Sequence, residues 1–252
     1  MPVHRLADMT WHAVRDLDRA GAVAILPVGA VEAHGPHLPL GTDVIIAEAM
    51  ARSAARRLSE DDDRTVLLLP PVWYTSAAFA EAFPGTVGVA PDTVRDTVRG
   101  IAASLAAQGV GTLAVANAHL DPTHLTSLRA AASEPPEGLR VVFLDLTRRA
   151  VAERLTEEFR TGACHAGRFE GSVVRAEAPA LYRADVADAL PPNPSSLSTA
   201  IRDGVTTFEG AGGPDAYFGW PADATAEEGR ATVETLGGLL ADAVRAAAES
   251  GG

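Results

Sequence analysis

Short apolar runs alternate, over the first 160 residues, with longer segments in which apolar side chains recur every three or four positions. The short runs are rich in Val, Ile and Leu and predict buried strands, whereas the longer segments predict amphipathic helices. Predicted strands lie at residues 22–28, 65–69, 112–116 and 140–146, and predicted helices at residues 43–58, 92–108, 122–132 and 147–160. Strands that alternate with helices in this way form a parallel sheet with helices on both faces. The pattern therefore predicts an α/β fold.

The pattern becomes less regular between residues 162 and 217, where Gly, Pro, Ser and Asn gather at positions 191–198 and 209–215. A loop-rich segment of that length in a compact protein usually carries a site or an interface. A last Ala-rich helix is predicted at residues 225–249. Because the sequence has neither an internal repeat nor a clear linker, we expect residues 1–252 to form a single domain.

Composition and charge narrow the class of protein. The chain has 47% hydrophobic and 21% charged residues, which is typical of a soluble globular protein. Its net charge of −12 argues against nucleic acid or an anionic membrane as a partner. The apolar runs are far shorter than the roughly 20 residues that span a bilayer, and the first residues lack the pattern of a signal peptide. The single cysteine, Cys164, excludes an internal disulfide, so we expect a cytoplasmic protein.

Ionisable side chains gather directly after the strand predicted at residues 22–28. Glu32, His34, His37 and Asp43 lie within the segment VGAVEAHGPHLPLGTD. Open α/β sheets bind ligands at the carboxyl ends of their strands. Glu32 and His34 are two positions apart, so in extended backbone both side chains point to the same side and can bind one metal ion. Taken alone, Asp43 could be the N-cap of the next helix and each histidine an ordinary core residue, but the clustering favours a site.

A second group follows the strand predicted at residues 112–116. His119 and Asp121 are again an imidazole and a carboxylate two positions apart. The two groups together suit a pair of divalent ions, such as Zn²⁺ or Mn²⁺, bridged by a carboxylate and a water molecule. A third segment reads CHAGRFEGS from Cys164, and His165 in it could protonate a leaving nitrogen as a general acid. By itself, this histidine could equally have no catalytic role.

These three segments, in this order, resemble the motifs of the creatininase family, the creatinine amidohydrolases and their relatives. EAHGPHLPLGTD matches the family's E-x-H-G-x-H-L-P-x-x-T-D without a gap, HAGRFEGS is similar to H-A-G-x-x-E-T-S, and NAHLDP is a variant of N-G-H-G-G-N. Lesser matches are FPGT at residues 83–86 and GWP at residues 219–221, and the resemblance covers about residues 23–229. It implies a three-layer αβα sandwich with a mainly parallel sheet, commonly a homo-oligomer (a hexamer), and hydrolysis of a non-peptide or cyclic amide C–N bond.

The resemblance also implies which residues bind two divalent metal ions. Glu32 and His119 would bind the first ion, His34 and Asp121 the second, and Asp43 would bridge them. Asp121 stands where creatininase has a glutamate, so the charge is kept but the side chain is one methylene shorter. The donor types favour zinc or manganese, with iron as a further option.

Positions around the substrate depart from the family pattern. His165 matches the catalytic histidine, but Cys164 stands where creatininase has a glutamate that supports it, and residues 159–163 lack the tryptophan that closes over creatinine. Cys164 could contact metal or substrate, or simply fill space. From the matching segments we expect Ser76, Cys164 and Trp220 at the substrate, although the loop around Trp220 could instead form an interface. These departures argue against creatinine itself as the substrate.

We therefore predict a metal-dependent amidohydrolase that cleaves a C–N bond of a small-molecule amide, lactam or formamide through a hydroxide that bridges two metal ions. Two alternatives stay open. One is a peptidase acting on a modified peptide, as in mycofactocin maturation, although such relatives usually keep the NGHGGN form. The other is a protein that binds metal but has lost catalysis and has a structural or regulatory role, which Cys164 and the NAHLDP variant favour.

Overall fold

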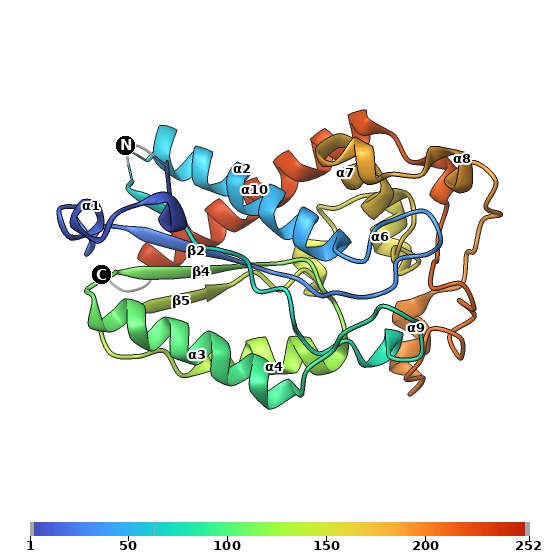
Figure 1. Ribbon diagram of the computed structural model, residues 1–252, viewed down its shortest axis with the longest axis horizontal. Helices are drawn as coiled ribbons and strands as arrows, with labels where there is room; N and C mark the ends of the chain where they lie inside the picture. The colour runs from blue at the N-terminus through green and yellow to red at the C-terminus, as the bar shows by residue number, and fades with distance from the viewer. Residues whose placement is uncertain (1–2, 63, 250–252) are drawn as a thin grey trace.

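A parallel sheet between two layers of helices forms the centre of the molecule in the computed structural model, which describes residues 3–62 and 64–249 (Figure 1). Within these residues the sheet has five strands in the order β1-β3-β2-β4-β5, and every neighbouring pair is parallel. The strands are β1 (Val3–Arg5), β2 (Val23–Val28), β3 (Val66–Leu68), β4 (Thr112–Asn117) and β5 (Arg140–Phe143). The predicted α/β class and parallel sheet are confirmed.

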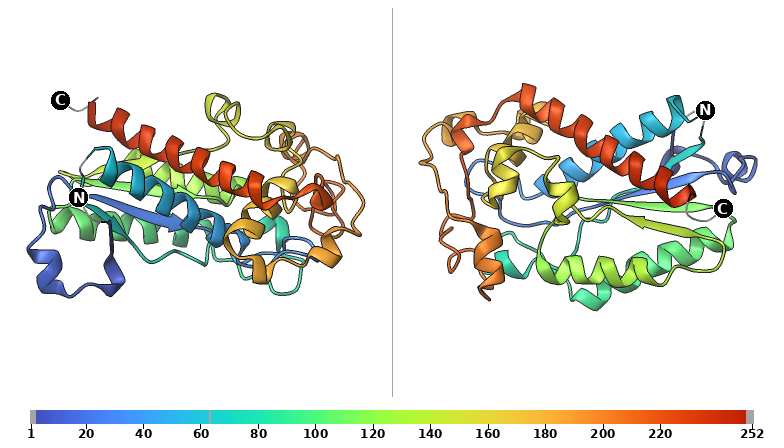
Figure 2. Two further views of the ribbon diagram at one scale, coloured as in Figure 1. Left: turned by 90° about the horizontal axis from the view of Figure 1, so that it is seen from above. Right: turned by 180° about the vertical axis from the view of Figure 1, so that it is seen from behind.

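Long helices cover both faces of this sheet (Figures 1 and 2). They are α2 (Thr42–Glu60), α3 (Pro91–Ala107), α4 (Pro122–Ser133) and α10 (Ala226–Glu249). Alternate residues of β2 pack on opposite faces: Val23 and Ile25 lie in one apolar core with α2 and α10, and Ala24 and Leu26 lie in another with α3 and α4. All residues of β2 and β4 are buried, as expected for parallel strands covered on both sides. The three-layer αβα prediction is thus confirmed.

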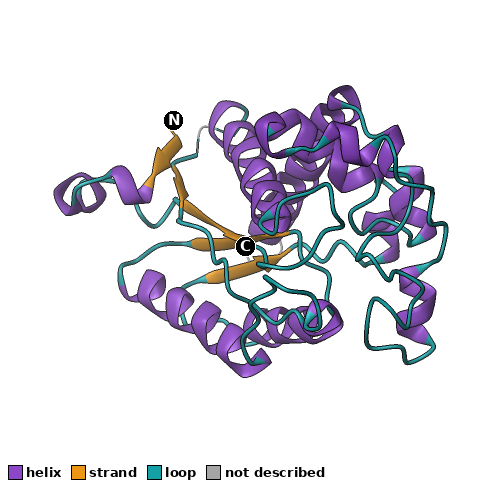
Figure 3. Ribbon diagram, turned by 45° about the vertical axis from the view of Figure 1, so that its right-hand side comes forward, coloured by secondary structure: helices purple, strands orange, loops and turns teal. Residues whose placement is uncertain are grey.

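Shorter elements lie beyond the carboxyl ends of the strands, where loops gather (Figure 3). The short α-helices there are α5 (Arg149–Ala152), α6 (Glu157–Thr161), α7 (Arg168–Glu177), α8 (Ala184–Ala187) and α9 (Leu197–Arg202). The remaining elements are α1 (Trp11–Arg15) and the 3-10 helices η1 (Leu6–Asp8), η2 (Ala78–Ala80), η3 (Pro179–Leu181) and η4 (Pro221–Asp223). No helix among the described residues is long and apolar enough to cross a bilayer.

Two expectations about helix ends differ from the structure for local reasons. The helix predicted at residues 147–160 is two helices, because the side chain of Thr156 accepts a hydrogen bond from the N–H of Phe159 and starts a new one. Neither Thr42 nor Asp43 caps α2, whose N-cap is Gly41 without a side-chain bond. The hydroxyl of Thr42 donates instead to a backbone carbonyl, and the Asp43 carboxylate turns toward the ends of the strands.

Candidate metal centre

The ends of β2 and β4 bring the predicted ligands together. The two strands are neighbours, and Val28 pairs with Asn117 at their carboxyl ends, so the segments that follow leave the sheet side by side. Gly29 allows the first turn of α2 to approach, since a Cβ atom there would lie 2.6 Å from the backbone nitrogen of Val44 and 2.8 Å from the carbonyl carbon of Asp43. This close approach places Asp43 beside the residues that follow both strands.

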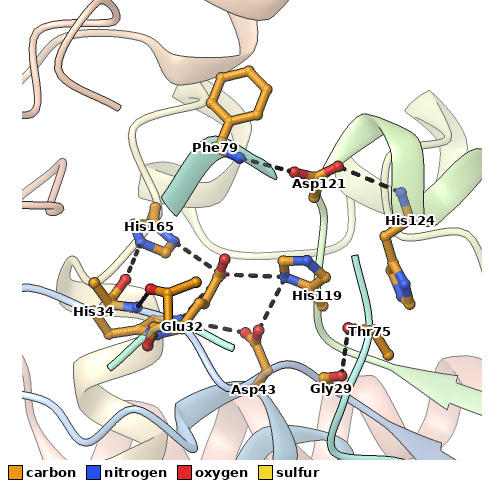
Figure 4. Close-up of polar contacts among 12 residues, drawn as sticks. Gly29, Glu32, His34, Asp43, Thr75, Phe79, His119, Asp121, His124 and His165 are labelled. Atoms are coloured by element: carbon orange, nitrogen blue, oxygen red, sulfur yellow. Dashed lines mark hydrogen bonds and ion pairs between the residues drawn. The ribbon is translucent and has the colours of Figure 1, made fainter. Parts of the chain in front are cut away.

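Two groups of buried nitrogen and oxygen donors share Asp43, and a third, overlapping group joins Glu32, His34 and His165 (Figure 4). Nδ1 of His119 lies 3.2 Å from Oε1 of Glu32 and 3.0 Å from Oδ2 of Asp43. Nε2 of His34 lies 3.3 Å from Oδ1 of Asp43 and 3.6 Å from Oε2 of Glu170. Within each group the donor atoms lie within 4.8 Å of one another. Asp43 belongs to both groups and presents one carboxylate oxygen to each, which is the arrangement of a bridging ligand.

Backbone carbonyls fix the orientation of both histidine rings. Nδ1 of His34 lies 3.1 Å from the carbonyl oxygen of Glu32, and Nε2 of His119 lies 2.7 Å from that of Ser76. A carbonyl oxygen only accepts, so these nitrogens carry a hydrogen, and the other nitrogen of each ring faces the carboxylates and has a lone pair for a metal ion when the ring is neutral. Histidines that bind metal are oriented in this way in proteins.

The charges in the cluster fit divalent cations. Glu32, Asp43 and Glu170 are buried, and no arginine of the described chain pairs with them. Buried carboxylates without compensation are costly, so protons or cations must accompany them. Moreover, Oε2 of Glu32, Nε2 of His34 and Oδ2 of Asp43 are buried without a hydrogen bond. A set of imidazole and carboxylate donors is suited to zinc or manganese, so these residues fit a pair of such ions.

The pKa values show how protons would compensate these charges. Burial lowers the pKa of His34, but the carboxylates of Asp43, Glu170 and Glu32 outweigh it and raise the pKa to about 10. Burial is outweighed in the same way at His119, whose pKa is raised by Glu32 and Asp43. The pKa of the Glu170 carboxyl is raised to about 8, chiefly by burial. Without metal, the cluster therefore keeps bound protons that compensate its carboxylates. Metal ions would supply this positive charge in place of the protons.

Glu170 is a candidate ligand that the sequence did not single out. It lies in the first turn of α7, five positions after His165, and it is the one carboxylate of the segment HAGRFEGS. Its Oε2 also accepts a hydrogen bond of 2.6 Å from the N–H of Ala166, which fixes the carboxylate beside His34. In this segment the sequence analysis singled out Cys164 and His165, and the glutamate was the signal that could have identified the further ligand.

Asp121 lies apart from both groups of donors. It is the N-cap of α4, and its Oδ1 accepts from the N–H and the hydroxyl of Thr123 at 2.8 and 2.6 Å. Its Oδ2 accepts from the N–H of Phe79 at 3.2 Å (Figure 4). The structure therefore brings Glu32, His34 and the other predicted ligands together but not Asp121, because protein donors occupy both of its oxygens.

His165 reaches the cluster from the loop-rich segment. Its Nε2 lies 3.0 Å from the carbonyl oxygen of Ala33, and its Nδ1 lies 4.0 Å from Oε1 of Glu32. The N–H of Ala33 in turn donates to the hydroxyl of Thr86, so the segment FPGT holds the backbone to which His165 is bonded. Burial, followed by the nearby charge of His34, holds the pKa of His165 well below its usual range. His165 is thus a neutral imidazole whose Nδ1 lone pair faces the donor cluster.

A cavity of about 440 Å³ opens from the cluster. The apolar part of its wall includes Phe79, Leu120, Phe159, Leu197, Ile201 and Phe208. Of the residues expected at the substrate, Cys164 lines this cavity, and burial raises the pKa of its thiol. Ser76 and Trp220 are not in the lining: the Ser76 hydroxyl bonds to that of Thr123, and the N–H of Trp220 donates to Glu158.

Comparison with known proteins adds to this geometry. A family model described as "Creatininase: Creatinine amidohydrolase" matches residues 7–244. The mycofactocin precursor peptide peptidase of Mycobacterium ulcerans (strain Agy99) is 31% identical over 211 residues, which cover 82% of this chain and 78% of that protein. The peptidase of the same name from Mycolicibacterium smegmatis is 41% identical over 75 residues, 30% of each chain. The creatinine amidohydrolase of Pseudomonas putida is 30% identical over 122 residues, 46% of this chain and 45% of that protein.

Solved structures resemble the whole chain. A crystal structure of creatinine amidohydrolase (creatininase) superposes with a TM-score of 0.70 at 24% identity and covers 95% of both chains. A structure described as creatininase with Mn gives a TM-score of 0.69 at 23% identity and covers 96% of this chain and 98% of the other. A mutant creatininase of Zn-Zn type gives a TM-score of 0.68 at 23% identity and covers 95% of this chain and 96% of the other. At these identities the likeness establishes the fold.

Proposed function

This chain belongs to the creatininase family, and from that premise we propose that it is a metal-dependent amidohydrolase that cleaves an amide bond of a peptide-like substrate. The observation that carries the proposal is the pair of buried donor groups that share Asp43 at the floor of a cavity of about 440 Å³. The relative that matches 82% of this chain is a peptidase. This likeness supports the peptide alternative over the small amide, lactam or formamide that the sequence favoured.

The altered segment NAHLDP is compatible with this proposal. His119 keeps its place in the donor cluster, and all four changed positions line the cavity: Ala118, Leu120, Asp121 and Pro122. The variation therefore alters the wall that faces a substrate and leaves the proposed ligand in place. A small amide remains the second candidate, because the P. putida creatinine amidohydrolase is 30% identical over 122 residues.

Each proposed metal ion has three protein ligands. Glu32, Asp43 and His119 would hold one ion, and His34, Asp43 and Glu170 the other, with zinc or manganese as the candidates. When bound, such a pair lowers the pKa of a water molecule and polarises the carbonyl group of an amide. The carbonyls that accept from His34 and His119 hold each ring in the tautomer that this binding needs.

His165 is the proposed carrier of a proton. Its Nε2–H is anchored to the carbonyl of Ala33, so the ring cannot turn away from the cluster. A neutral ring held in this tautomer accepts a proton at Nδ1, on the side that faces Glu32, and can then donate it to the departing nitrogen. The predicted role of general acid thus requires His165 to act first as a base. The apolar wall of the cavity limits the water that could compete for this proton.

Removal of a ligand tests the function. We expect Glu32→Ala and His119→Ala to lose both the bound zinc or manganese and the hydrolysis of a panel of peptides. Elemental analysis measures the bound metal, and mass spectrometry measures the hydrolysis. His12→Ala, which changes an exposed histidine outside the cavity, should keep both. Full hydrolysis by a protein without metal would refute the proposal. Tight metal binding without hydrolysis of any peptide, small amide, lactam or formamide would support the non-catalytic alternative instead.

A further inference from the structure

Three arginines surround the opening of the cavity that leads to the donor cluster. Arg149, Arg160 and Arg202 line it, and they belong to α5, α6 and α9. All three are exposed, whereas the acidic residues of the same lining, Glu32, Asp43, Asp121 and Glu170, are buried. On a chain of net charge −12, the exposed charges of this opening are thus positive.

Two of these guanidinium groups are not neutralised by a carboxylate. Within residues 3–62 and 64–249, neither Arg160 nor Arg202 forms an ion pair, and Arg202 donates only to the neutral hydroxyl of Thr199, at 2.9 Å. Arg149 differs, because it pairs with Glu153 of its own helix at 2.8 Å. Arg160 and Arg202 can therefore bind an anion without first breaking an ion pair.

Three kinds of side chain line the cavity. The floor holds the carboxylates and imidazoles of the donor cluster. Apolar side chains also line it, and two of them, Phe159 and Ile201, directly precede Arg160 and Arg202 in the sequence. A ligand that fills the cavity can therefore contact metal ligands, apolar groups and exposed guanidinium groups. A guanidinium group matches a carboxylate in geometry and charge and can bind it through two hydrogen bonds.

We propose that the substrate carries an apolar group next to the amide and, beyond it, a carboxylate that Arg160 and Arg202 bind. This inference rests on the proposed function, because it takes the amide to lie at the donor cluster. For a peptide substrate, this carboxylate would be the free carboxyl terminus. Arg160 and Arg202 are then specificity-determining residues that act on substrate binding.

Matched probes test the proposal on the zinc-loaded protein. The probes are N-acetylated dipeptides of Gly followed by Val, Leu, Phe or Tyr, each with a free carboxylate and, separately, as the C-terminal amide. Binding is measured by ligand-observed NMR titration, and hydrolysis is followed in the same samples. We expect at least one acid to bind about ten-fold more tightly than its amide, the size of a charge-assisted contact. Added salt should weaken binding of the acid and leave the amide unchanged.

Variants assign the preference to the arginines. In the double variant Arg160→Gln and Arg202→Gln the preference should fall below about three-fold, because the charge-assisted contacts are lost. Arg230→Gln removes an exposed arginine outside the cavity and should keep the preference. Equal binding of acids and amides, binding of no acid at all, or a preference that survives in the double variant would overturn the inference.

The outcomes also separate this inference from the proposed function. If acids and amides are hydrolysed equally well, the function holds and carboxylate recognition fails. If Glu32→Ala hydrolyses the probes as well as the unchanged protein does, the proposed function fails, whereas a preference that depends on Arg160 and Arg202 still establishes recognition of the carboxylate.

Discussion

Two carboxylates beside the cluster differ in what already occupies their oxygens. Asp121 accepts hydrogen bonds from backbone and hydroxyl donors at both oxygens, as helix N-caps do. Glu170 accepts one bond from the N–H of Ala166 and otherwise faces His34 and the shared Asp43. Among the described residues, Glu170 belongs to a group of donor atoms that lie within 4.8 Å of one another, and Asp121 belongs to none. The geometry thus assigns the metal to Glu170 and helix capping to Asp121, and each assignment can be tested.

Substitution of Glu170 tests the second ion. We expect Glu170→Gln to bind about half as much zinc as the unchanged protein, because one of the two donor groups loses its third ligand. Elemental analysis after dialysis measures the content, and circular dichroism checks that the fold is kept. Glu177→Gln changes the other end of the same helix and should retain all of the metal. Full metal content in Glu170→Gln would contradict the assignment.

Substitution of Asp121 should affect stability and leave metal binding unchanged. Asp121→Ala removes the N-cap of α4 and deprives the N–H of Phe79 of its acceptor, so we expect a loss of about 1 kcal/mol or more in the free energy of unfolding. Asp121→Asn retains an acceptor and should lose less. Urea unfolding and metal analysis of both variants provide the measurement. If both variants lost one ion, Asp121 would be a ligand, as the family resemblance implied.

At the scale of elements, close packing of α10 on α2 depends on one glycine. A Cβ atom at Gly237 would lie 2.3 Å from Oγ and 2.4 Å from Cβ of Ser53, so α2 and α10 would have to separate. We expect Gly237→Ala to lower the free energy of unfolding by about 1–3 kcal/mol, the usual cost of overpacking. At Gly238 an added Cβ meets only the side chain of Arg57, at 3.8 Å. Gly238→Ala is therefore the control, and it should be neutral or gain up to about 1 kcal/mol from helix propensity.

The measurement is urea unfolding of the two glycine variants beside the unchanged protein. The difference between the variants carries the information, since both gain the same helix propensity. Equal stability of Gly237→Ala and Gly238→Ala would contradict the packing of α10 on α2.

The elements that the sequence predicted are those whose signal is local. β2 and β4 are continuous apolar runs, and α2, α3 and α10 have long amphipathic patterns, so each could be recognised by itself. The helix α7 was expected to be loop, because its start depends on a distant residue. The carboxylate of Glu158, on α6, accepts from the N–H groups of Arg168 and Phe169 and caps α7. Because this cap comes from a residue ten positions earlier, the sequence around the start of α7 does not show it.

The same distinction applies to the site. Glu32, His34 and His119 could be predicted because they follow strands whose ends must meet in a parallel sheet. Glu170 and the arginines at the opening depend on how the loop-rich segment folds over the sheet, which periodicity does not specify. For Asp121, sequence spacing predicted a ligand, whereas the helix that starts at Pro122 takes its carboxylate as a cap.

At the scale of the whole molecule, the cluster connects parts of the chain that are far apart in sequence. Glu32 and Asp43 come from the first β-α unit, His119 from the end of β4, and Glu170 from α7 in the loop-rich segment. Metal ions bound there would join this segment to the sheet. Because ions that bind the folded chain stabilise it by mass action, metal removal should lower its stability.

The loss on metal removal should grow as the pH rises. In the metal-free protein, the pKa of His34 is raised from 6.5 to about 10 and that of Glu170 from 4.5 to about 8. A group whose pKa is raised by folding stabilises the fold fully below its unfolded pKa, and this contribution is lost as the pH rises through the folded pKa. The Glu170 contribution therefore declines between pH 4.5 and about 8, and the His34 contribution between 6.5 and about 10.

Between about pH 7 and 9 we thus expect the free energy of unfolding of EDTA-treated protein to fall steadily, as these two groups lose their protons. The histidines with lowered pKa values, His37, His124 and His165, act in the opposite direction but below pH 6.5, outside this window. Zinc-loaded protein should show little of this decline, because cations replace the protons, and zinc added at pH 7 should release protons. Urea unfolding at several pH values, with EDTA and with zinc, provides the comparison. Equal stability of the metal-free protein at pH 7 and pH 9 would show that the buried carboxylates are compensated by something other than these protons.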